Sequence, residues 1–128
     1  MKTIEVSAAI IIKDEKILAT ARGYGEFEGL YEFPGGKRKE NESFEEALIR
    51  EIKEELNADI KIEKHLVKIE HDYEKFHLTM ACFICSLKSE TIELLEHLDA
   101  KWLKKEELLT VNWVPADIKV INILVNNK

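Results

Sequence analysis

Residues 36–58 read GKRKENESFEEALIREIKEELNA and carry the clearest structural signal in the chain. Ser43 is followed three residues later by Glu46, a capping box in which side chain and backbone satisfy each other's hydrogen bonds at a helix start. This spacing predicts a helix from about Phe44 to Leu56. Asn57 predicts its end, because Asn is the commonest substitute for Gly in the left-handed position that follows a helix.

The side chains of this predicted helix sort onto separate faces when successive residues are placed about 100° apart around its axis. An apolar face holds Leu48, Ile49, Ile52 and Leu56, and an acidic face holds Glu51, Glu54 and Glu55. Exposed like charges on one helix face repel by roughly 0.2–0.5 kcal/mol per pair. Arg50 can neutralise one of these carboxylates, and a hard divalent cation such as Mg²⁺ is a natural partner for the rest. For the helix alone, a solvated acidic face explains the pattern equally well.

The whole stretch resembles the Nudix box, whose pattern is Gly-x5-Glu-x7-Arg-Glu-u-x-Glu-Glu-x-Gly-u, where u is bulky and apolar. Seven of the nine defined positions agree: Gly36, Glu42, Arg50, Glu51, Ile52, Glu54 and Glu55. Asn57 replaces the final Gly and keeps its turn chemistry, whereas Ala58 is small for the last apolar position. The resemblance extends over nearly the whole chain and is greatest to the MutT-type members, which include 8-oxo-dGTP diphosphatases and CTP pyrophosphohydrolases.

The resemblance implies a fold and a metal site. The implied fold is α+β, an α/β/α sandwich in which the box helix packs against a mixed sheet and a further helix lies near the C-terminus. The implied metal ligands are Glu51, Glu54, Glu55, Gly36 and Glu96, around Mg²⁺ or alternatively Mn²⁺. Arg50 would orient the carboxylates together with Glu42, Glu96 would act as a ligand or base, and Ile52 and Asn57 would be structural.

The resemblance also implies a substrate side of the site. Arg22 and Lys37 would hold phosphate oxygens by charge-assisted hydrogen bonds, although Lys37 is equally well explained as a surface charge. Asp117, in Pro115-Ala116-Asp117, falls where the family reads the base; an ionised Asp117 favours bases with an amino group or ring N–H. Its alternative role is a favourable charge at a helix N-terminus. Phe33, or else Trp113, would stack on the base, although either residue is also a candidate for the core.

The rest of the chain predicts strands and one further helix. Apolar and β-branched runs predict a hairpin of 4–12 and 17–19, a short strand at 32–36 after a loop, a second hairpin of 60–69 and 78–87, and a strand at 100–103. A helical turn follows at 105–109. Pro115 predicts the start of a last helix, with Ile118, Ile121, Ile123, Leu124 and Val125 inside.

Composition limits the class of protein. The chain has 128 residues and few Gly or Pro, which predicts one domain spanning residues 1–128. A net charge of −6 argues against a nucleic-acid polymer as partner, and no apolar run is long enough for a membrane span, so we expect a cytoplasmic protein. Cys82 and Cys85 lie three apart in an apparent strand, hence on opposite faces, which predicts buried free thiols.

These observations favour a Mg²⁺-dependent hydrolase that converts a nucleoside triphosphate and water to the monophosphate and pyrophosphate. The expected substrate is a small-molecule nucleotide, either an oxidised purine such as 8-oxo-dGTP or a cytidine nucleotide, and the expected assembly is a monomer or homodimer. One alternative is a hydrolase of ADP-ribose or another nucleoside diphosphate derivative. The other is a binding module that holds a nucleotide without cleaving it, which the intact box carboxylates disfavour.

Overall fold

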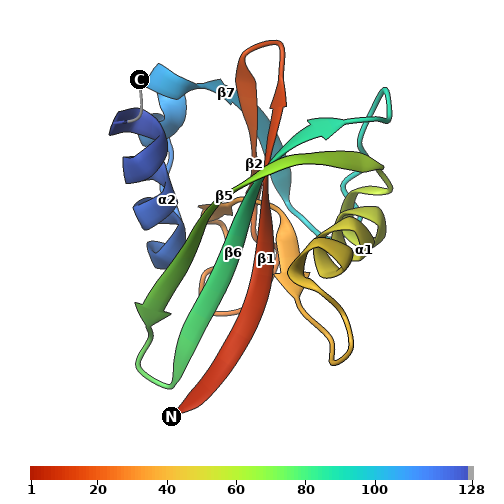
Figure 1. The fold of residues 1–128 in the computed structure, drawn as a ribbon. Coiled ribbons are helices and arrows are strands. Elements are labelled where there is room, and N and C mark those ends of the chain that lie inside the picture. The colour runs from red at the N-terminus through yellow and green to blue at the C-terminus, as the bar shows by residue number, and fades with distance from the viewer. Residues whose placement is uncertain (127–128) are drawn as a thin grey trace.

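The computed structural model describes residues 1–126 and has three layers, with a central mixed sheet between helices α1 (Phe44–Leu56) and α2 (Pro115–Asn126). Figure 1 shows the two helices on opposite sides of the strands. A 3-10 helix, η1 (Lys105–Thr110), precedes α2. The α+β sandwich expected from the sequence is confirmed.

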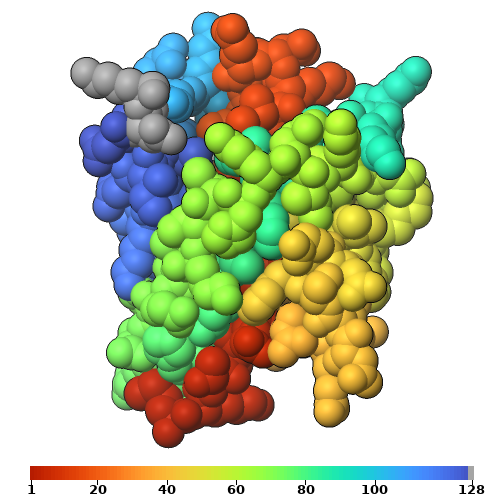
Figure 2. Space-filling view, in the orientation of Figure 1, coloured from red at the N-terminus to blue at the C-terminus, as the bar shows by residue number. Residues whose placement is uncertain are grey.

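Seven strands form the sheet within residues 1–126. They are β1 (Lys2–Lys13), β2 (Lys16–Ala21), β3 (Tyr31–Glu32), β4 (Gly35–Lys37), β5 (Ile60–Asp72), β6 (Phe76–Leu87) and β7 (Asp99–Lys104). The main order is β3-β2-β1-β6-β5, while β4 pairs with β1 and β7 pairs with β2. β1 runs parallel to β6 and antiparallel to its other neighbours. In Figure 2, β5 forms the surface between α2 and the segment that leads into α1.

The central strand β1 is buried on both faces, because its alternate side chains enter two cores. Ala8 and Ile10 belong to the core that includes residues of α2, and Ala9 and Ile11 belong to the core under α1. Cys82 and Cys85 of β6 divide in the same way between the two cores and are buried free thiols, as their spacing predicted.

Local sequence signals set the ends of α1 at the predicted residues. Ser43 Oγ accepts from the Glu46 N–H at 3.0 Å, and the Glu46 carboxylate accepts from the Ser43 N–H at 2.8 Å. Asn57 ends the helix in the left-handed conformation, with φ 47° and ψ 44°. The prediction that Ile49 is buried is wrong, because its side chain lies at the edge of the apolar face and is 47% exposed.

Two other sequence predictions need correction. The single strand expected over 32–36 is two strands, because β3 pairs with β2 whereas β4 pairs with β1, and Phe33 and Pro34 lie between them. In α2, Ile118 and Val125 are exposed, and Val120 takes the buried position instead. Every helix within residues 1–126 is too short or too polar to cross a lipid bilayer.

Candidate active site

Arg50 connects the loop before α1 to the acidic face of that helix. Its Nε and Nη2 donate to the two carboxylate oxygens of Glu42 at 2.7 and 2.9 Å. Its Nη1 lies 2.7 Å from Glu51 Oε1 and 3.3 Å from Glu54 Oε1. Nη2 also donates to the Lys37 carbonyl at 3.0 Å. We expected Arg50 to neutralise one carboxylate of the helix, but its planar guanidinium contacts two of them.

This pairing keeps the network charged. Hydrogen bonds from Arg50, helped by the Lys39 N–H, lower the pKa of Glu42 to about 2. The same hydrogen bonds to Glu42 and Glu51 raise the pKa of Arg50. Both groups stay ionised near neutral pH, so the position of Arg50 does not depend on pH in that range.

Gly35, just before the box, and Gly36, its first residue, allow close approaches that a side chain would prevent. A Cβ atom on Gly36 would overlap the carboxylate of Glu51, and a Cβ atom on Gly35 would overlap the carbonyl oxygen of Ser7 in β1. Glu51 is consequently held against the backbone of β4. The Gly pair thus brings the helix carboxylate and the strand backbone to the same place.

Glu55 lies at the most acidic point of the site. Its Oε1 accepts from the Gly35 N–H at 3.3 Å. Burial, followed by repulsion from Glu51, Glu32 and Glu96, raises its pKa to about 9. A bound cation would relieve both effects, and an all-carboxylate donor set suits a hard divalent ion. The residues present therefore fit a divalent metal.

Backbone hydrogen bonds place Glu96 over the end of α1. The N–H groups of Glu93 and Leu95 donate to the carbonyls of Leu56 and Glu55 at 2.8 and 3.1 Å, so the loop caps carbonyls that the helix leaves unpaired. Asn57 Nδ2 donates to Glu93 at 2.8 Å and fixes the same loop from the side. Glu96 follows directly and reaches the acidic pocket.

This acidic pocket has a volume of about 360 Å³. Its charged lining residues are Arg22, Glu32, Lys37, Glu51, Glu55 and Glu96, with His97 beside them. Glu54 does not line it and is 53% exposed at the side of the helix. Across residues 1–126, no three His, Cys, Asp or Glu side chains already surround a common metal position.

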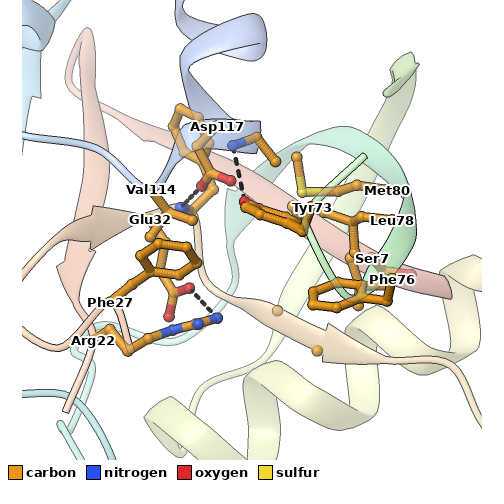
Figure 3. Close-up of a pocket in the computed structure, with 16 residues that line it drawn as sticks. Ser7, Arg22, Phe27, Glu32, Tyr73, Phe76, Leu78, Met80, Val114 and Asp117 are labelled. Carbon is orange, nitrogen blue, oxygen red and sulfur yellow. Dashed lines mark hydrogen bonds and ion pairs between the residues drawn. The ribbon is translucent and has the colours of Figure 1, made fainter. Parts of the chain in front are cut away.

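An apolar pocket adjoins the acidic one. Figure 3 shows the side chains that line it, with Phe27, Tyr73, Phe76, Leu78, Met80, Val114 and Asp117 among them. Asp117 is 4% exposed, and its Oδ2 accepts from the Phe33 N–H at 2.8 Å. Burial raises its pKa to about 8, which favours the neutral carboxyl group over the ionised one near neutral pH. A neutral carboxyl group both donates and accepts a hydrogen bond.

The chain matches the family model of the NUDIX domain over residues 7–122. It belongs to the Nudix family. It is 34% identical over 122 residues to the CTP pyrophosphohydrolase of Escherichia coli (strain K12), covering 94% of this chain and 90% of that protein. It is 33% identical over 125 residues to the 8-oxo-dGTP diphosphatase of Buchnera aphidicola subsp. Schizaphis graminum, covering 97% and 95%.

A solved structure agrees with this assignment. The MutT protein of methicillin-resistant Staphylococcus aureus 252, a Nudix hydrolase, is 36% identical, with a TM-score of 0.77 and complete coverage of both chains. The protein is accordingly a Nudix hydrolase that acts on phosphoric anhydride bonds of small-molecule nucleotides. Enzymes of this family generally use divalent metal ions.

The Nudix site brings most of the sequence-predicted residues together and adds further aromatic ones. Phe33 and Trp113 are both buried and pack against each other, with ring centroids 4.8 Å apart, and of the two Phe33 lines the apolar pocket. The same pocket is lined by Phe27, Tyr73 and Phe76, which were not predicted from the sequence. The available signal was that Tyr73 and Phe76 flank the charged turn between two long strands.

Proposed function

We propose that this Nudix hydrolase is a Mg²⁺-dependent nucleoside triphosphate pyrophosphohydrolase that releases the monophosphate and pyrophosphate. We place cytidine nucleotides first among its substrates and 8-oxo-dGTP second. The observation that carries the proposal is the junction of an apolar pocket ending at Asp117 with a pocket lined by Glu51, Glu55 and Glu96. A nucleotide has the same two ends, an aromatic base and a metal-binding phosphate chain.

The acidic pocket supplies the catalytic half of the proposal. Glu51, Glu54, Glu55 and Glu96, with the backbone of Gly36, would hold Mg²⁺. When bound, the ion would shield phosphate charge and lower the pKa of a coordinated water. Glu54 is exposed at the side of the helix and would turn inward to join the other carboxylates. Arg50, itself held by Glu42, would orient the carboxylates of Glu51 and Glu54.

Two basic side chains are proposed to hold the phosphate chain. Arg22 lines both pockets, and Lys37 lines the acidic one from strand β4. Each can donate charge-assisted hydrogen bonds to phosphate oxygens. The many carboxylates around them exclude an anionic substrate unless a cation neutralises part of their charge, which makes the proposed reaction metal-dependent.

The base preference is proposed from the protonation of Asp117. The pairing edge of cytosine offers an amino donor beside a ring-nitrogen acceptor, which complements the donor and acceptor of a neutral carboxyl group. The end-to-end similarity to a CTP pyrophosphohydrolase supports this choice. On its N7/O6 edge, 8-oxoguanine also offers a donor beside an acceptor, whereas guanine has two acceptors on that edge.

The test is hydrolysis of CTP, dCTP, 5-methyl-dCTP, 8-oxo-dGTP, dGTP and ADP-ribose to the nucleoside monophosphate, with Mg²⁺ and with chelator. The second product is pyrophosphate for the triphosphates and ribose 5-phosphate for ADP-ribose. We expect metal-dependent turnover of a cytidine nucleotide or 8-oxo-dGTP and loss of turnover in Glu54→Gln with nucleotide binding retained. If only ADP-ribose is hydrolysed, the substrate is a nucleoside diphosphate derivative and the proposed substrate class is wrong. If the protein binds nucleotides but hydrolyses none of these compounds, it acts as a binding module and the proposed activity is wrong.

We also propose that residues 1–128 make one domain that acts in the cytoplasm as a monomer or homodimer. The sheet and both helices share the two cores described above, which supports a single domain. Gel filtration with light scattering measures the assembly directly.

A further inference from the structure

Five residues line both pockets and so mark the place where the pockets meet. They are Val6, Arg22, Glu32, Gly35 and Gly36. Only two of them, Arg22 and Glu32, have polar side chains. Figure 3 shows this pair at one side of the apolar pocket, with Phe27 next to it.

Glu32 is held from two directions at this junction. Its Oε1 lies 3.0 Å from Arg22 Nη2, and its Oε2 lies 3.4 Å from His97 Nε2. The side chain of His97 is 5% exposed and that of Glu32 is 18% exposed. A nearly buried ring therefore lies behind the carboxylate, while the carboxylate itself remains accessible to the pocket.

The strands explain why these three side chains meet. Arg22 follows the end of β2, Glu32 lies in β3 opposite Thr20 of β2, and His97 comes just before β7. The Leu98 N–H donates to the Ala21 carbonyl at 3.0 Å, which fixes the loop next to Arg22. A Cβ atom on Gly23 would overlap the carbonyl of Glu96, so only glycine lets the two segments lie this close.

We propose that Glu32 recognises a sugar hydroxyl of the nucleotide and that His97 is the positioning residue that holds Glu32 in place. The inference rests on the proposed function. In a nucleotide the sugar joins the base to the phosphates, so it must lie where the two pockets join. The apolar side chain of Val6 and the bare backbone of Gly35 and Gly36 offer no side-chain acceptor there, whereas a carboxylate oxygen accepts from a hydroxyl group.

The competing explanation is that Glu32 only orients Arg22 toward the phosphates. In that case its loss would affect every nucleotide equally, with or without sugar hydroxyl groups. If Glu32 contacts the sugar, its loss matters only when the hydroxyl is present. The two explanations therefore differ in a ratio between substrates.

The experiment measures kcat and KM of the full chain with CTP, dCTP and ddCTP, which lose the sugar hydroxyls one at a time. For the wild type we expect a fall in kcat/KM of about 10- to 100-fold at the step that removes the recognised hydroxyl, the range for a hydrogen bond to a charged group. In Glu32→Ala, removal of the same hydroxyl should lower kcat/KM by less than about threefold. The change should appear mainly in KM, because the sugar does not react.

His97 is tested with two variants. In His97→Ala, the fall in kcat/KM on removal of the recognised hydroxyl should be smaller than in the wild type. In His97→Gln most of that fall should return, since the glutamine amide can donate from about the position of Nε2. Each comparison is a ratio between substrates on one preparation, so a partly unfolded variant does not change it.

Three outcomes would overturn the inference. If removal of the hydroxyl lowers kcat/KM as much in Glu32→Ala as in the wild type, Glu32 does not contact the sugar. If the fall is as large in His97→Ala as in the wild type, His97 is not a positioning residue. Equal turnover of all three substrates by the wild type would mean that no hydroxyl is recognised. Failure of the wild type to hydrolyse any nucleotide would instead contradict the proposed function.

Discussion

Arg50 is the residue on which the geometry of the acidic pocket most depends. A planar guanidinium satisfies both oxygens of Glu42 while a third nitrogen reaches Glu51 and Glu54. An ammonium group is a single point charge and cannot maintain these contacts together. Contact with Glu42, Glu51 and Glu54 at once is therefore specific to arginine.

We expect Arg50→Lys to lower kcat/KM by about 10- to 100-fold, the usual cost of losing a partner that orients a metal ligand. Steady-state hydrolysis of the preferred triphosphate at saturating Mg²⁺ measures the effect. The matched control is Lys53→Ala on the same helix, which removes only an exposed ion pair with Asp59. Unchanged activity in Arg50→Lys would show that the hydrolysis does not need the planar guanidinium.

Residue roles could be predicted from the sequence where partners share a short segment. Glu42 and Arg50 are eight positions apart, so the box pattern was enough to pair them. The contact of Glu32 with His97 depends instead on where β3 and β7 lie around β2, which no local spacing encodes. The raised pKa of Asp117 likewise comes from burial by residues distant in the chain.

The helices and strands were likewise predictable where a short segment of sequence determines them. The start and end of α1 were predicted because a capping box and a left-handed Asn are local signals. The division of 32–36 into β3 and β4 was missed, because it is set by a change of pairing partner from β2 to β1. Hydrophobic pattern alone does not specify such a change.

The turn between β1 and β2 carries a strain that substitution can remove. Asp14 and Glu15 both have positive φ, at 52° and 65°, in a two-residue hairpin that favours Asn-Gly. We expect the double substitution Asp14→Asn, Glu15→Gly to raise the free energy of unfolding by about 1 kcal/mol. The measurement is a higher urea midpoint with an unchanged slope.

The turn between β5 and β6 provides the control for this prediction. Glu74 and Lys75 are not among the described residues with positive φ. Lys75→Gly should therefore lower stability, because it adds freedom to the unfolded chain without relieving strain. An equal gain in both turns would mean that glycine acts there for some other reason.

On the scale of the whole molecule, function comes from segments that are far apart in the sequence. The apolar pocket combines Phe27 from a loop, Phe76 from β6 and Asp117 from α2, and the sequence predicted only the last of these. The sequence did predict Phe33, which lines the same pocket, but it did not predict Tyr73. Hydrophobicity alone does not separate an aromatic side chain that lines a pocket from one that fills a core. The fold class was predictable, but most of the pocket walls were not.

Global stability should depend on pH through the same acidic pocket. The pKa of Glu55 is about 9 in the folded chain and near 4.5 when exposed. Between these values the unfolded chain loses a proton that the folded chain keeps, so rising pH favours unfolding. With chelator present, the wild type should lose stability relative to Glu55→Gln as the pH rises from about 5 to 9.

Mg²⁺ should reverse this trend, because a bound cation stabilises the ionised carboxylate and binding releases its proton. Thermal unfolding of the wild type and Glu55→Gln, with chelator and with Mg²⁺ at each pH, measures both effects. The increase in Tm on adding Mg²⁺ should grow with pH in the wild type and stay nearly flat in the variant. Asp117 titrates in the same direction but is present in both chains, so it cancels in the comparison. Parallel pH curves for the two proteins would show that Glu55 does not link metal binding to stability.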